Sequence, residues 1–145
     1  MIAGDPMSRR SRSREVALQL LYEVDLNPQR SAEGSSQFLN ERLRHDEELI
    51  RFAGQLIDGV KSHSDHLDQL ITDHTDNWAL TRIAAIERNI LRLGAYELIY
   101  TDTPGSVVIN EAVELSKRFG GKHSAGFVNG ILDRILHLDE QDRTY

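Results

Sequence analysis

The sequence has no cysteine, only three prolines and no long apolar run. Without cysteine the fold cannot contain a disulfide, which is compatible with a reducing cytoplasm. No stretch approaches the roughly 18 apolar residues of a membrane span. No apolar signal-peptide segment follows the N-terminal arginines either. We therefore expect a cytoplasmic protein without a membrane segment, and 145 residues suffice for one domain with its own core.

Positive charge is concentrated at one place in an otherwise acidic chain. Four arginines lie within six residues, and because the formal net charge is −6, the remaining residues carry −10. An acidic body is unfavourable for wrapping duplex nucleic acid, so any nucleic-acid site should be local. Clustered permanent positive charges are typical of a surface that binds polyanions. The cluster consists of Arg9, Arg10, Arg12 and Arg14.

The apolar spacing predicts an all-α protein, a compact bundle of about seven helices. Apolar residues recur at intervals of three and four, and no segment alternates with a period of two. We expect residues 1–10 to form a flexible basic arm. Gly120 and Gly121 should end one helix in a left-handed conformation, and Ser124 should cap the last one. The predicted helices cover about 11–26, 36–45, 46–60, two turns around 67–71, 81–100, 106–119 and 124–138.

Four sequence blocks, in the same order along the chain, resemble the NusB family of transcription antitermination factors. The first is the arginine arm followed by the helical segment 17–22, and the second comprises residues 90–93 and 95–98. The third is Asn-Glu-Ala-Val-Glu-Leu at 110–115 followed by Phe119 and Gly120, and the fourth is Phe-Val-Asn-Gly-Ile-Leu-Asp at 127–133. The resemblance covers nearly the whole chain and is weakest between Asn27 and Glu47.

The resemblance implies a non-enzymatic protein of two packed three-helix subdomains, here about 11–76 and 77–138. It implies binding of the single-stranded boxA element in nascent ribosomal RNA transcripts, together with the ribosomal protein NusE. It also implies indirect association with other Nus factors and RNA polymerase. The resemblance requires no cofactor.

Two surfaces are candidates for RNA binding. The family uses the arginine arm on RNA, which favours Arg9, Arg10, Arg12 and Arg14 as contacts. The second surface lies at the end of one helix and the start of the next, where free backbone N–H groups attract anions. Phe127 could stack on a base there or simply belong to the core. The candidates on this second surface are Lys117, Arg118, Lys122, Ser124 and Phe127.

A separate set of residues is a candidate for partner binding. Glu87 and Glu97 fall within the apolar arc of the central helix, where a lone carboxylate would be costly to bury. Each carboxylate therefore either has a partner inside the protein or contacts a basic partner protein. The family's protein interface favours docking for Glu87. Glu15, Leu18 and Tyr22 form a second face of the first helix, which binds a partner or packs internally.

The sequence leaves one alternative function open. The chain could be a helical protein-interaction module, possibly a homodimer, that binds no specific RNA and whose arginines pair with acidic surfaces. His63 and His66 lie three residues apart, but a metal site needs at least a third ligand, so we predict no metal site. No phosphate-binding loop or nucleophile motif occurs.

Overall fold

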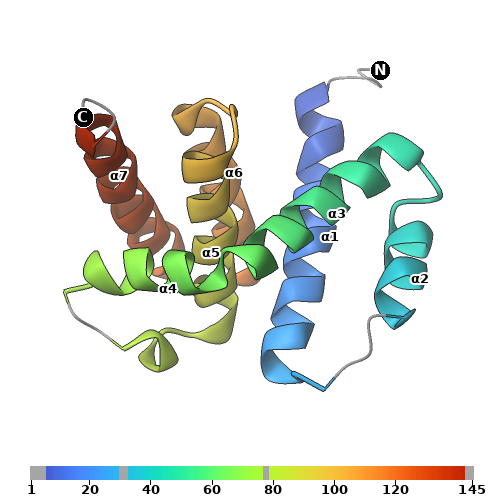
Figure 1. Ribbon diagram of the computed structural model, residues 1–145, viewed down its shortest axis with the longest axis horizontal. Helices are drawn as coiled ribbons and strands as arrows, with labels where there is room; N and C mark the ends of the chain where they lie inside the picture. The colour runs from blue at the N-terminus through green and yellow to red at the C-terminus, as the bar shows by residue number, and fades with distance from the viewer. Residues whose placement is uncertain (1–5, 30–32, 77–78, 143–145) are drawn as a thin grey trace. The chain divides into compact units, whose positions relative to one another are not determined.

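The computed structural model describes residues 6–29, 33–76 and 79–142, and within them it confirms an all-α fold with seven α-helices (Figure 1). One short 3-10 helix, η1, precedes the fifth α-helix. The helices are α1 Pro6–Leu26, α2 Glu33–Arg42, α3 Glu47–Ser62, α4 Ser64–Asp73, η1 Leu80–Arg82, α5 Ala85–Tyr100, α6 Gly105–Phe119 and α7 Ser124–Asp142.

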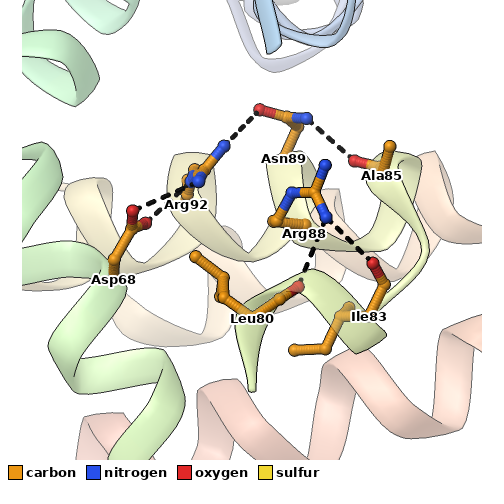
Figure 2. A network of polar contacts seen from close by, with 7 residues as sticks. All are labelled: Asp68, Leu80, Ile83, Ala85, Arg88, Asn89 and Arg92. Carbon is orange, nitrogen blue, oxygen red and sulfur yellow. Dashed lines mark hydrogen bonds and ion pairs between the residues drawn. The ribbon is translucent and has the colours of Figure 1, made fainter. Parts of the chain in front are cut away.

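The chain divides into two compact units, residues 1–59 and 60–145. The family resemblance implied subdomains that meet near residue 76, whereas these two units meet close to the end of α3. The reason is that α4 packs against α5 and so belongs to the second unit. Arg92 of α5 holds Asp68 of α4 through two hydrogen bonds, of 2.7 and 3.2 Å (Figure 2).

In the first unit, α1 is held by both α2 and α3. The Ser13 hydroxyl donates to the carbonyl of Leu49 on α3 at 2.9 Å. Arg42 of α2 donates to the Gln19 side chain of α1 at 2.6 Å. Consecutive residues 13–18 of α1 are all buried, so this helix is covered on more than one side. The buried apolar residues of the unit are Val16, Ala17, Leu18, Leu20, Leu21, Leu39, Leu43, Ala53, Leu56 and Ile57.

In the second unit, α5, α6 and α7 pack pairwise on one another (Figure 1). α5 and α7 pack closely at Gly94, where a Cβ atom would lie 2.7 Å from a methyl group of Leu132. A larger residue at this position would require the Leu132 side chain to move. Glu97 is buried in this unit, and its carboxylate accepts a hydrogen bond from the Thr103 hydroxyl at 3.4 Å. Of the two alternatives for Glu97, the structure therefore shows an internal partner.

Several helix boundaries differ from the prediction. α1 begins at Pro6, five residues before the expected start, so residues 6–10 are helical and not a flexible arm. Proline is favourable in a first helical turn because its missing N–H has no partner there anyway. α2 ends at Arg42, because Arg44 and His45 have positive φ angles of 52° and 58°. α5 begins at Ala85, not near Thr81.

The late start of α5 has a side-chain cause. Ile83 and Ala84 are extended, which interrupts the helical pattern between η1 and α5. The Arg88 guanidinium donates to the carbonyls of Leu80 and Ile83, at 3.3 and 3.1 Å (Figure 2). The Leu80 carbonyl also accepts the Ile83 N–H at 3.2 Å, so Arg88 adds a second donor there and supplies one for the Ile83 carbonyl.

The end of α6 does not have the left-handed glycine that the sequence predicted. Gly120 has φ −93° and ψ −171°, an extended conformation that any residue adopts. Glycine is needed at position 120 because there is no room for a side chain. A Cβ atom would lie 2.6 Å from the Ser124 side chain and 2.7 Å from the Ser116 carbonyl oxygen. The glycine thus permits the close approach of the α6 end and the α7 start.

Candidate nucleic-acid interface

Three of the four clustered arginines lie at the surface of α1. Arg9 donates to Asp46 at 2.5 Å and lies 3.7 Å from Glu48, and its side chain remains 39% exposed. Arg10 is exposed. Arg12 contacts Glu15 at 3.1 Å and the Arg42 carbonyl at 3.5 Å, with 44% of its side chain exposed. Solvent-exposed ion pairs contribute little to stability, so these cations can exchange carboxylates for phosphates at small cost.

Arg14 does not belong to this surface. It is only 2% exposed, and its guanidinium lies 5.1 Å from the centre of the Phe52 ring. The sequence grouped it with the other three arginines, but one helical turn further along, α1 is already buried. Direct phosphate contact by Arg14 therefore conflicts with the structure, and the exposed cluster, hereafter the arginine surface, consists of Arg9, Arg10 and Arg12.

Asp46 fixes the start of α3 beside the arginine surface. Its side chain accepts the Leu49 N–H at 3.2 Å, and its carbonyl accepts the Ile50 N–H at 2.9 Å, so it is the N-cap residue. The Leu49 N–H, aided by the nearby Arg9 guanidinium, lowers the pKa of Asp46 below its ordinary value of 3.8.

This lowered pKa predicts acid sensitivity. A carboxylate whose pKa is lower in the folded state stabilises the fold above its unfolded pKa, and this stabilisation is lost as the pH falls through the folded value. Asp46→Asn keeps a capping side chain but removes the charge. We expect the wild type to exceed Asp46→Asn in free energy of unfolding at pH 7, with the gap closing towards pH 3. Urea unfolding at both pH values measures it, and a gap that does not change with pH would contradict the prediction.

The second predicted RNA surface lies at the α6–α7 turn. Lys117 and Arg118, in the last turn of α6, are exposed, as are Lys122 and His123 in the turn itself. Lys117 contacts Glu114 at 3.4 Å. The exposed cations Lys117, Arg118 and Lys122, which we call the turn surface, lie directly before the N-terminus of α7, where the helix dipole favours anions.

Ser124 and Glu87, predicted for different partners, bind each other. The Ser124 hydroxyl donates to the Glu87 carboxylate at 2.5 Å and accepts the Gly121 N–H at 2.9 Å. Ser124 is 3% exposed and is the first residue of α7. Its expected RNA contact therefore conflicts with its burial. The bond also gives Glu87 the internal partner that was one of its two alternatives, although its carboxylate stays partly exposed.

Phe127 lies one turn into α7 and is partly buried. It lines a groove of about 320 Å³ in the second unit, beside two helical glycines, Gly126 and Gly130, that leave the α7 surface flat. Arg134 closes one end, because it donates to the His74 carbonyl at 3.1 Å. A half-buried ring beside an open groove fits both the core and the stacking alternatives.

The predicted partner face of α1 is largely covered. Leu18 has no exposed surface and Glu15 is 7% exposed, while Tyr22 is partly buried. Leu18 is therefore a core residue, which corrects the expectation that it contacts a partner. The helical wheel suggested one core stripe, but burial of residues 13–18 in sequence means that the opposite side of α1 is covered too.

The sequence pattern of the NusB family matches residues 11–137. The chain belongs to the NusB family. The transcription antitermination protein NusB of Myxococcus xanthus (strain DK1622) is 46% identical over 133 residues, which cover 89% of this chain and 95% of that protein. The predicted resemblance is therefore confirmed.

Solved structures agree with this assignment to the NusB family. The chain is similar to NusB of T. maritima, with a TM-score of 0.79 and 36% identity over 88% of this chain and 90% of that one. It is also similar to the NusB fold in a crystal structure of antitermination factors NusB and NusE in complex with dsRNA. There the TM-score is 0.82 and the identity 28%, over 91% of this chain and 98% of that chain.

Membership of the NusB family makes the protein a non-enzymatic transcription antitermination factor. Among the described residues, none of the helices combines the length and hydrophobicity that crossing a bilayer demands. Within the same residues, no three His, Asp or Glu side chains come together in a way that could hold a metal ion.

His63 and His66 instead join an aromatic cluster that sequence reasoning missed. His63 stacks on Tyr100 with ring centres 3.8 Å apart, and Tyr96 stacks beside them. His66 forms a hydrogen bond with the Tyr100 hydroxyl. The cluster connects the start of α4 to the end of α5. A spacing of four between the two tyrosines was the signal, because residues i and i+4 share a helix face.

Proposed function

We propose that this NusB-family chain acts in the cytoplasm by binding single-stranded boxA-type RNA of nascent ribosomal RNA transcripts together with NusE. Through NusE it would associate with other Nus factors and RNA polymerase. The observation that carries the proposal is the arginine surface, three cations that reach solvent from one α-helix of an acidic chain. A helical scaffold reduces the ordering entropy that a flexible arm would lose on binding.

The proposed division of labour follows from the chemistry of each surface. Arg9 and Arg12 hold phosphates, which supplies affinity without sequence preference. Lys117, Arg118 and Lys122 on the turn surface extend the contact, and Phe127 can stack on an unpaired base. Glu87 and Tyr22, both partly exposed, are the remaining candidates for NusE. Binding the RNA and NusE at the same time makes the complex stronger than either interaction alone.

The strand preference needs a direct test, because the similar NusB and NusE crystal structure contains dsRNA. A fluorescent unpaired boxA-type RNA is titrated with the protein, with and without NusE, and compared with the same RNA annealed to its complement. We expect tighter binding of the single strand and a further gain with NusE. If neither RNA form binds under either condition, the interaction-module alternative replaces this proposal. Equal binding of both forms would contradict the preference for unpaired RNA.

Charge reversal at Glu87 is expected to weaken NusE capture by at least tenfold. A basic partner would meet repulsion in Glu87→Lys, and unfavourable charge juxtaposition costs several kcal/mol. The matched control is Ser124→Ala, which removes the internal hydrogen bond but keeps the carboxylate. We expect this control to stay within about twofold of the wild type in a pull-down titration, with circular dichroism verifying both folds. If Ser124→Ala loses as much capture, or Glu87→Lys unfolds, Glu87 has an internal role instead.

A further inference from the structure

A groove in the first unit lies beside the arginine surface and has no role so far. It has a volume of about 490 Å³, between α1 and the first three turns of α3. Small-molecule sites have volumes of roughly 300–1,000 Å³, so the groove can hold a group of nucleotide size. Its lining residues are Arg10, Glu47, Glu48, Arg51, Phe52 and Gln55.

The groove contains a flat cationic platform. The Arg10 guanidinium lies 4.6 Å from the centre of the Phe52 ring, and Arg10 is exposed. The buried Arg14 guanidinium contacts the same ring at 5.1 Å, which holds Phe52 in position. A guanidinium that lies on an aromatic ring keeps its plane fixed, and RNA-binding proteins stack unpaired bases on such planes.

The charges of the groove favour a base over a phosphate. Arg10 and Arg51 contribute two positive charges, and Glu47 and Glu48 contribute two negative ones. A phosphate would meet two carboxylates at close range, which is unfavourable. A neutral planar base carries donors and acceptors on its edge, and both kinds find a counterpart among these side chains.

We propose that this groove binds one unpaired nucleobase of the RNA, with guanine as the best match. The inference deepens the proposed function and rests on it. Guanine stacks on the Arg10–Phe52 platform, and its N1–H and N2–H₂ groups donate to Glu47 or Glu48. Its O6 and N7 atoms accept from Arg51, the commonest specific pairing of a guanine edge. Arg9 and Arg12 then hold the flanking phosphates.

An abasic scan tests the stacking. Each nucleotide of the unpaired boxA-type RNA is replaced in turn by an abasic one, and affinities are measured for the wild type and for Phe52→Leu. At one guanosine position, we expect that removing the base weakens RNA binding by the wild type about tenfold. Stacking of one base contributes about this much to affinity. Removing the same base should weaken RNA binding by Phe52→Leu less than twofold. A scan in which every position costs both proteins equally would overturn the proposal.

The edge contacts have their own test on two exposed residues, Glu47 and Glu48. Inosine lacks the N2 amino group, so replacing the sensitive guanosine by inosine should weaken the wild type about threefold. Glu47→Ala with Glu48→Ala should remove this difference, because alanine offers no acceptor to the amino group. A sensitive position that is not guanosine, or a difference that persists in the variant, overturns the assignment of guanine. If the wild type binds none of these RNAs, the proposed function itself fails. If replacing Arg9 and Arg12 weakens RNA binding but Phe52→Leu shows the same abasic scan as the wild type, only this inference fails.

Discussion

Replacing Arg9 and Arg12 together by alanine is expected to weaken binding of the unpaired boxA-type RNA by about thirtyfold. A hydrogen bond to a charged group contributes about 1.5–3 kcal/mol. Both arginines must give up existing contacts, to Asp46 and Glu15 respectively, so about 1 kcal/mol each is a suitable net figure. Arg10 stays in place in this variant, which keeps the proposed base site intact.

Salt dependence gives the prediction a second readout. For single strands the slope of log affinity against log salt is about −0.7 per phosphate contact, so the variant should lose about 1.4 of the wild-type slope. Fluorescence anisotropy titrations between 50 and 200 mM salt measure both quantities.

A control with the same charge change separates local contact from general electrostatics. Lys61→Ala with Arg82→Ala removes two exposed positive charges from other places in the chain. We expect this control to bind RNA within about threefold of the wild type and with nearly the same salt slope. If the control loses as much affinity as the arginine variant, the arginine surface has no special role in binding RNA.

The fold class was predictable because its signal is local. Each helix carries apolar residues at spacings of three and four, and those stripes pack as expected, for example Ile90, Leu91 and Leu98 on α5. The late start of α5 was not predictable. It depends on Arg88 reaching back to Leu80 and Ile83, and nothing in the apolar pattern distinguishes such an arginine from a solvated one.

The exposed part of the candidate site could be predicted from charge clustering, whereas the burial of its members could not. Arg10 and Arg14 lie one turn apart and both contact Phe52 of α3, yet only Arg14 is buried. Ser124 and Glu87 are 37 residues apart, so no helical wheel places them together. Contacts of this range arise from packing between helices, which a single sequence does not encode in its periodicity.

Replacing Arg92 by methionine is expected to lower the free energy of unfolding by about 2 kcal/mol. Arg92 holds Asp68 of α4 with two hydrogen bonds and also donates to the Asn89 side chain at 3.3 Å (Figure 2). Asn89 is 1% exposed, so losing one of its hydrogen bonds inside the protein is costly. Breaking a fully buried ion pair costs about 3–5 kcal/mol, and the 32% exposure of the Asp68 side chain reduces that figure.

Two further variants make this prediction specific to the link between α4 and α5. Asp68→Asn keeps a hydrogen-bond acceptor for Arg92 but removes the charge, so we expect about half the loss of Arg92→Met. Arg82→Met changes an exposed arginine on η1 and should stay within about 0.5 kcal/mol of the wild type in urea unfolding. If Arg92→Met is as stable as Arg82→Met, the apolar contacts of α4 with α5 are sufficient. The ion pair would then serve only to orient the two helices.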